Sequence, residues 1–151
     1  MKKFILVLML LLGSFSFAAK NVIFSAETVK GKIVEVAEDT TDNMCFYYSY
    51  GKKGKPEITL KCYKEETVFS NFGNFGGNAY VYTVRFINPQ AKKYSYQLKK
   101  AVASQRTFYI LEVYKDKEMI SSIDLKPKTM KGEFPYDAIP TELDDRAFMS
   151  F

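Results

Sequence analysis

Short apolar segments recur along this chain and restrict most of it to β structure. Tyr, Phe, Val, Ile and Thr gather in these segments, and clusters of Gly, Asn, Pro and Lys separate them. The clearest segment, residues 79–87, is nearly apolar on both faces, which is typical of a strand in the middle of a sheet. Asn88 and Pro89 then end it. The pattern predicts strands rather than helices along most of the chain.

The predicted strands belong to one domain, because no linker or internal repeat divides the chain. They are residues 28–37, 44–50, 57–63, 79–87, 94–98, 107–114 and 119–125, and residues 21–25 offer an added edge strand. A turn at residues 115–117 predicts that residues 107–114 and 119–125 form a hairpin. From about residue 126 the strand pattern stops, and Pro140 suits the first turn of a helix over residues 140–148. We expect an all-β domain over residues 19–151, a single antiparallel sandwich or small barrel of about seven strands with a short C-terminal helix or irregular tail.

Residues 1–18 have the three parts of a secretory signal peptide. Lys2 and Lys3 form the positive start, residues 4–12 are apolar, and Ser16 and Ala18 supply small residues before the cut. The apolar run is too short for a transmembrane helix, which needs about 20 residues. We expect cleavage after Ala18, a periplasmic or secreted location in a bacterial envelope, and no membrane-spanning segment afterwards.

The absence of His excludes several kinds of chemistry. The chain has no His and no Trp, so Ser-His-Asp and Cys-His catalysis and His-ligated metal sites are not available. The formal charge of +5 falls to +3 once Lys2 and Lys3 are removed with the signal peptide. Export and this mild charge argue against a nucleic-acid partner, and no cofactor or metal is predicted.

Two cysteines in an exported chain predict a disulfide. Cys45 and Cys62 lie on either side of a turn signal at residues 51–56. A two-residue loop at residues 53–54 sets Cys45 opposite Cys62 and Tyr47 opposite Leu60. The same register places Tyr47 on the cysteine face with the core, and Tyr48 and Tyr50 on the other face.

A tandem repeat provides the candidate binding residues. Asn71-Phe72-Gly73 is followed by Asn74-Phe75-Gly76, within a predicted connection over residues 65–78. Two Phe in a loop are unusual, and binding residues often lie on loops carried by a rigid scaffold. The predicted binding residues are Phe72, Phe75, Asn71, Asn74, Tyr48 and Tyr50. The alternative is that Phe72 and Phe75 fold back and cap the core.

Three other patterns point only weakly to chemistry. Ser49 and Lys52 match Ser-x-x-Lys, but the companion motifs of penicillin-recognising enzymes are absent. The neighbouring carboxylates at residues 65–66 and 144–145 point different ways on a strand or helix, which disfavours a glycosidase-like pair. The lysines around residues 94–98 are typical of a strand edge guarded against aggregation.

We therefore predict an exported, non-enzymatic binding protein of the bacterial envelope. It would act as an inhibitor or as an adhesion-type module. Its partner would be a protein or a glycan. The alternatives are a small carboxylate-based hydrolase and a structural component of the envelope.

Overall fold

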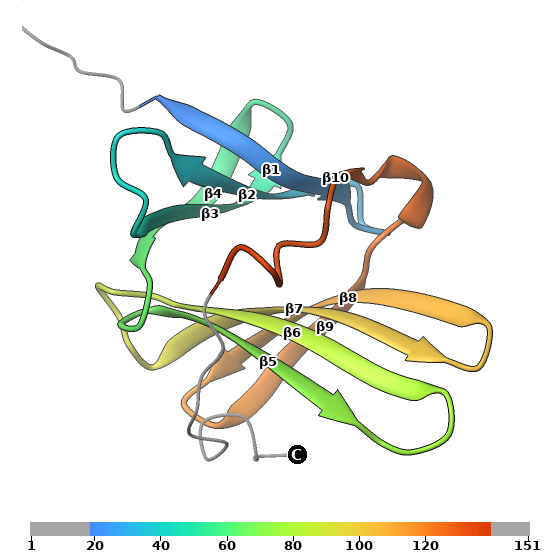
Figure 1. The fold of residues 1–151 in the computed structure, drawn as a ribbon. Coiled ribbons are helices and arrows are strands. Elements are labelled where there is room, and N and C mark those ends of the chain that lie inside the picture. The colour runs from blue at the N-terminus through green and yellow to red at the C-terminus, as the bar shows by residue number, and fades with distance from the viewer. Residues whose placement is uncertain (1–18, 140–151) are drawn as a thin grey trace, which may run out of the picture.

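A computed structural model describes residues 19–139 of the chain. Within this range it contains ten strands and one short 3₁₀ helix, η1 (Pro127–Thr129) (Figure 1). The predicted signal peptide and the predicted helix over residues 140–148 lie outside the described residues. The all-β class is confirmed, and the strand count exceeds the predicted seven.

The strands form two antiparallel sheets of five strands each. The first sheet has the order β10-β1-β2-β3-β4, and the second has the order β5-β6-β7-β8-β9. In the first sheet the bounds are Lys131–Gly132 (β10), Lys20–Glu27 (β1), Ile33–Asp39 (β2), Cys45–Lys52 (β3) and Lys55–Tyr63 (β4). In the second sheet they are Val68–Asn74 (β5), Ala79–Ile87 (β6), Tyr94–Ala103 (β7), Arg106–Lys115 (β8) and Glu118–Asp124 (β9).

The two sheets lie one above the other as a sandwich and do not close into a barrel (Figure 1). The chain crosses between them after β4 and again after β9, where Thr28 forms an isolated bridge with Leu125. β6 lies inside the second sheet and β8 forms a hairpin with β9, so both of these predictions are confirmed.

The core lies between the two sheets, and Tyr48 of β3 is at its centre. Its ring stacks on Phe86 of β6 and on Tyr96 of β7, with 5.1 Å between centroids in each pair. Tyr48 is fully buried, and its hydroxyl finds no hydrogen-bond partner among residues 19–139. Aromatic contact between the sheets is therefore retained despite the cost of one unsatisfied polar atom.

The segment after β10, residues 133–139, runs between the sheets (Figure 1). The ring centroid of Phe134 lies 5.8 Å from that of Phe24 in the first sheet and 6.2 Å from that of Tyr109 in the second. The hydroxyl of Ser70 donates a hydrogen bond of 2.8 Å to the carbonyl of Ile139, which is itself buried. The predicted irregular tail thus fills part of the core.

One predicted strand and one predicted connection are wrong, because a turn was missed in the first and a strand in the second. Residues 28–37 do not form one strand: the chain turns at Thr28–Lys32, with Gly31 at a φ of 80°, before β2 begins. Such a positive φ favours glycine. Residues 65–78 are not one long connection either, because β5 occupies Val68–Asn74 and pairs with β6.

The predicted register of the β3–β4 hairpin is correct only beside the turn. Lys52 faces Lys55 and Gly51 faces Pro56, but a bulge then shifts the pairing so that Tyr48 faces Leu60. Gly51 has a φ of 154°, and a Cβ there would lie 2.4 Å from the backbone nitrogen of Glu57. Only glycine fits this close approach, and the extra residue of β4 sits at this point.

The predicted disulfide between Cys45 and Cys62 is therefore wrong. Cys45 faces Tyr63 and Cys62 faces Phe46, so alternation along the strands places the two thiols on opposite faces of the first sheet. Both are free and buried. The Cys62 thiol points into the core, where it contacts the carbonyl of Ile87 at 3.7 Å. Burial raises the pKa of Cys62 to about 12 and also raises the pKa of Cys45, which keeps both protonated and unreactive.

The thiols provide a test of this register. Protein purified without reductant should react with two equivalents of a thiol reagent after denaturation, because both cysteines are free. The native protein should react slowly, because both are buried. A denatured, unreduced chain without titratable thiols would contradict the observed register.

The hydroxyl of Tyr48 gives a second test. Tyr48→Phe should raise the free energy of unfolding by about 1 kcal/mol, because it removes a buried hydroxyl that has no partner and keeps the ring stack. Urea unfolding measures the change, and Tyr96→Phe is the control on the other side of the stack. Destabilisation by Tyr48→Phe would show that the hydroxyl is hydrogen-bonded in solution.

Candidate functional site

A group of partly exposed aromatic rings lies where the inner face of the second sheet is no longer fully buried. We call Phe72, Tyr80, Tyr82 and Tyr136 the aromatic cluster. The ring of Phe72 lies 5.1 Å from that of Tyr82 and 6.3 Å from that of Tyr80. Tyr82 contacts Tyr80 at 5.6 Å and Tyr136 at 4.9 Å. The four rings therefore form one continuous surface.

The backbone explains why these rings meet. Phe72 faces Tyr82 across the β5–β6 ladder, and Tyr80 follows two residues away on the same face of β6. Along this face of β5 the exposed fraction rises from 0% at Val68 and Ser70 to 44% at Phe72. The cluster is therefore the end of the core face that the first sheet leaves uncovered.

Charged groups border the aromatic cluster. The ammonium of Lys100 on β7 lies 5.6 Å from the centroid of the Tyr82 ring, within the range of a cation–π contact. Lys100, Tyr82, Phe134, Tyr136 and Asp137 line an open hollow of about 150 Å³. One positive and one negative side chain thus lie at the edge of an aromatic surface.

The structure separates the two Phe residues that the sequence suggested as one binding loop. Phe72 lies within β5 and points to the inner face, whereas Phe75 lies against Gly73, where a Cβ would be 3.2 Å from its ring. Gly73 alternates with Phe72, so Phe75 lies toward the outer face of the second sheet. Phe75 is 63% exposed and makes no part of the aromatic cluster.

The other predicted binding residues have structural positions. The side chain of Asn74 accepts a hydrogen bond of 2.9 Å from the Gly76 amide and so shapes the β5–β6 turn. The carbonyl of Asn71 accepts a bond of 3.3 Å from the Thr83 hydroxyl. Tyr48 is fully buried, so its predicted place on an exposed face is wrong, and Tyr50 packs half-buried against the core. The bulge at Gly51 accounts for both corrections, since it brings Ile58 and Leu60 to the face of Tyr48 and Tyr50.

Sequence reasoning did not select Tyr80, Tyr82, Lys100 or Tyr136 as site residues. A signal for two of them was present, because the alternate residues of β6 from Tyr80 to Phe86 are all large and apolar or aromatic. Nothing in the local pattern signals Tyr136, which reaches Tyr82 only because residues 133–139 return to the core.

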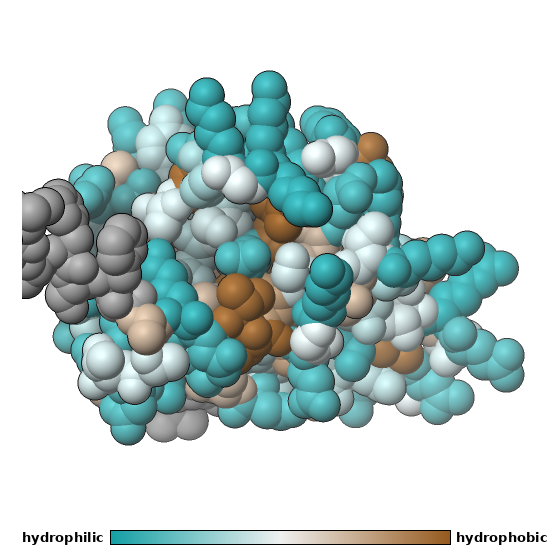
Figure 2. Space-filling model, turned by 90° about the horizontal axis from the view of Figure 1, so that it is seen from above, coloured by the Kyte–Doolittle hydropathy of each residue, from teal (hydrophilic) through white to brown (hydrophobic). Residues whose placement is uncertain are grey.

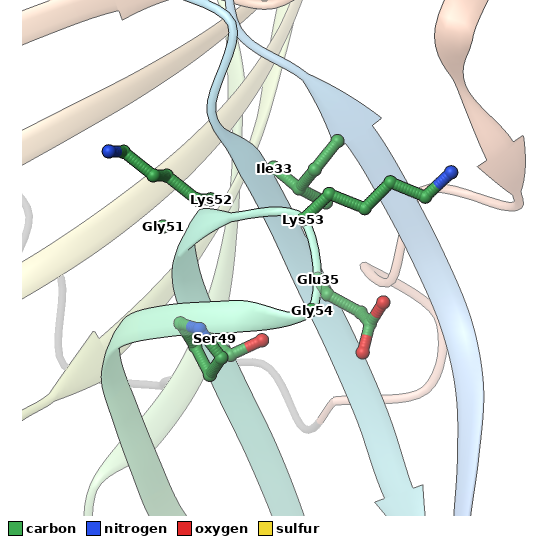
Figure 3. Close-up of a pocket in the computed structure, with 8 residues that line it drawn as sticks. Ile33, Glu35, Ser49, Gly51, Lys52, Lys53 and Gly54 are labelled. Atoms are coloured by element: carbon green, nitrogen blue, oxygen red, sulfur yellow. The ribbon is translucent and has the colours of Figure 1, made fainter.

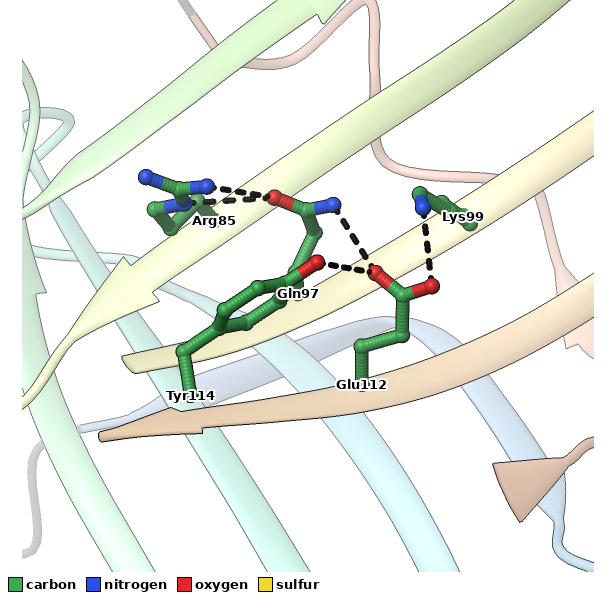
Figure 4. Close-up of polar contacts among 5 residues, drawn as sticks. All are labelled: Arg85, Gln97, Lys99, Glu112 and Tyr114. Atoms are coloured by element: carbon green, nitrogen blue, oxygen red, sulfur yellow. Dashed lines mark hydrogen bonds and ion pairs between the residues drawn. The ribbon is translucent and has the colours of Figure 1, made fainter. Parts of the chain in front are cut away.

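A buried polar network on the outer face of the second sheet is a second candidate (Figure 4). Glu112 of β8 is 6% exposed. Its carboxylate accepts hydrogen bonds from Gln97 at 3.2 Å and Tyr114 at 2.8 Å, and forms an ion pair of 2.8 Å with Lys99. Arg85 donates twice to Gln97, at 3.2 and 3.0 Å.

This network is built to join strands. It links β6, β7 and β8, and both carboxylate oxygens of Glu112 are occupied (Figure 4). Burial, followed by the bond to Glu112, raises the pKa of Tyr114 to about 12, so its hydroxyl remains a donor. A satisfied network of this kind specifies a structure and leaves no acceptor for a substrate proton.

A third candidate is a hollow of about 250 Å³ on the outer face of the first sheet, beside the β3–β4 turn (Figure 3). Ser49, Lys52, Lys53 and Glu35 help to line it. Figure 3 shows Lys52 and Lys53 extending away from each other, and no hydrogen bond joins Ser49 to Lys52 within the described range. Figure 2 shows that hydrophilic side chains dominate this face around a narrow hydrophobic strip. A nucleophile and its base must be within hydrogen-bond reach, so the Ser-x-x-Lys pattern gains no support.

The remaining titratable cluster stabilises the β2–β3 connection. Asp39 accepts bonds of 2.7 and 2.9 Å from the hydroxyl and amide of Thr41, and one of 3.0 Å from the Tyr47 hydroxyl. These donors, led by the Thr41 hydroxyl, lower the pKa of Asp39 to about 2. Residues 19–139 contain no group of three or more His, Cys, Asp or Glu that could hold a metal ion. No helix in this part of the chain is long and apolar enough to cross a membrane.

The lowered pKa of Asp39 predicts how stability depends on pH. The folded pKa of about 2 is below the usual value, so the bonds to Asp39 stabilise the fold above about pH 4 and lose their effect as pH falls toward 2. Asp39→Asn should lower the urea midpoint at pH 7, and this deficit should shrink between pH 4 and pH 2. An equal deficit at pH 7 and pH 2 would rule out an ionised Asp39 as the source.

Comparison of the chain with models of protein families, with curated proteins and with solved structures finds no match. Its function must therefore be argued from its own surfaces. Among the candidates, the aromatic cluster is the one that combines exposed apolar area with charged groups at its edge.

Proposed function

We propose that the protein is an exported, non-enzymatic binding protein of the bacterial envelope, and that its partner is a protein bound at the aromatic cluster. The signal-like pattern of residues 1–18 supports export. The aromatic cluster supports binding. The proposal extends the binding role predicted from the sequence but moves it from a loop to the end of the second sheet.

The observation that carries this proposal is the exposure of Phe72. Its side chain lies on a face whose preceding members, Val68 and Ser70, are completely buried, yet 44% of Phe72 is exposed. The three Tyr rings of the aromatic cluster are half-buried beside it. A continuous apolar surface, unlike a single exposed ring, marks interaction sites on soluble proteins. A partner that covers this end of the sheet would complete the burial of the core face.

The geometry of the rings favours a protein over a glycan. The ring of Phe72 is tilted by 43° to that of Tyr82, which is in turn tilted by 65° to that of Tyr136. Such a surface offers faces and edges to protruding side chains rather than one flat platform. Tyr is also enriched among the residues that dominate protein–protein binding energy, and Lys100 and Asp137 would lie at the polar rim. Many protease inhibitors act through preformed surfaces.

The hydrolase alternative gains no observation in its favour. Glu65 and Glu66 are exposed turn residues, and Glu112 is held by its own network. Residues 144 and 145 lie outside the described range. An acid–base pair needs two carboxyls that face one site.

A matched pair of substitutions tests the proposal. Phe72→Ser should weaken capture of a crosslinked envelope protein by roughly 30-fold or more, as expected for a residue at the centre of an interface. Phe75→Ser should leave capture within about threefold, because Phe75 is more exposed but lies away from the aromatic cluster. Crosslinking of envelope extract, followed by mass spectrometry, measures both.

Equal loss with both variants, or with neither, would reject the aromatic cluster as the binding surface. The melting temperature of Phe72→Ser should remain close to that of the unaltered protein, which shows that lost capture is not lost folding. Binding to isolated peptidoglycan, with no crosslinked protein, would assign the cluster to a glycan instead.

A further inference from the structure

Lysines that lack a carboxylate partner gather at one end of the first sheet. The turn between β1 and β2 holds Lys30. The turn between β3 and β4 holds Lys53, and Lys52 and Lys55 are the strand residues on either side of it. Lys128 lies in η1, beside the first turn. We call these five residues the basic edge. Within residues 19–139, none of the five has an ion pair.

The pairing of the strands brings these turns together. Ile33 at the start of β2 faces Gly51 at the end of β3, so the two hairpin turns are neighbours. The amide of Val29 donates to the carbonyl of Asp124 at 2.9 Å, and the amide of Glu27 donates to the Thr129 hydroxyl at 2.9 Å. The basic edge therefore runs across three strand spacings, about 15 Å.

Nearby acids compensate little of this charge. Glu57 is bound to Lys32 at 2.7 Å, and Glu27 is bound to Lys126. Glu35 and Asp124 are the other carboxylates beside the turns, against the five lysines of the basic edge. At the end with the β6–β7 and β8–β9 turns, four lysines lie with two carboxylates, those of Asp116 and Glu118. The basic edge, with five lysines against two unpaired carboxylates, is therefore the more positive of these two ends.

An exposed apolar side chain lies among these lysines. Val29, at the tip of the β1–β2 turn, is 56% exposed and immediately precedes Lys30. Peripheral proteins bind the bilayer interface by burying apolar side chains among the headgroups while basic side chains are attracted to anionic lipids. The basic edge contains no Arg, which fits diffuse attraction to a charged surface better than bidentate recognition of single phosphates.

We propose that the basic edge docks the protein on an anionic phospholipid bilayer, with Val29 inserted among the headgroups. This surface is distinct from the aromatic cluster, and the proposal does not rest on the protein partner proposed there. Each lysine near an anionic membrane strengthens binding by about fivefold. Three of them therefore contribute roughly 100-fold.

Two matched triple variants test the electrostatic part. The full protein should sediment with vesicles of phosphatidylglycerol and phosphatidylcholine, and remain in solution with phosphatidylcholine alone. Replacement of Lys30, Lys53 and Lys128 with Gln should weaken binding roughly 100-fold. The same replacement of Lys92, Lys93 and Lys117, which are also exposed but lie at the other turns, should change it by less than about threefold. Equal effects of the two triples, or no sedimentation with anionic vesicles, would overturn the proposal.

Insertion is tested with a single fluorophore, because the chain has no Trp. On addition of anionic vesicles, the emission of Val29→Trp should shift to the blue, and brominated lipid should quench it. Val22→Trp is the control, since Val22 is 48% exposed but lies on β1 away from the turn; its emission should not change. Unchanged emission from Val29→Trp would overturn insertion. If the protein binds a soluble polyanion as tightly as it binds anionic vesicles, and Val29→Ser does not weaken that binding, the basic edge would be assigned to such polymers instead.

Discussion

The bulge opposite Gly51 determines which face of the β3–β4 hairpin meets the second sheet. Because β4 carries one extra residue there, Tyr48 and Tyr50 share a face with Leu60 and Ile58. Without the bulge, Tyr48 and Tyr50 would lie on one face of the hairpin, and Leu60 and Ile58 on the other. The inter-sheet stack of Tyr48 on Phe86 depends on this choice, and so does the separation of the two thiols. The choice of side chains that enter the core from this hairpin thus depends on position 51, where only glycine fits.

The same packing explains where a surface remains. The first sheet and residues 133–139 cover the inner face of the second sheet at Val68, and cover it only in part at Phe72. The aromatic cluster is therefore continuous with the core. On the outer face of the second sheet, by contrast, the Glu112 network satisfies its own polar groups and joins three strands. One face of this sheet offers a binding surface, and the other contributes a fixed framework.

The local sequence pattern correctly predicted the elements whose structure depends on neighbouring residues. The alternation of residues 79–87 and the turn at 115–117 were sufficient for β6 and for the β8–β9 hairpin. The bulge could not be predicted in this way, because it is selected by burial against the other sheet. Residues 71–76 were misjudged because Gly and Asn are typical of loops, although this segment pairs along β6. Within the candidate site, Phe72 was predicted, whereas Tyr136 depends on a contact between distant parts of the chain.

The position of the last described segment also bears on how the chain folds. β10 pairs with β1, the first strand, and residues 133–139 lie between sheets whose strands all precede them. These contacts join residues that are far apart in the sequence, so the chain must lose loop-closure entropy before they form. Until residues 133–139 pack between the two sheets, the part of the core around Phe24 and Tyr109 is incomplete. A sandwich completed in this way is therefore expected to fold more slowly than a protein whose contacts are mostly local.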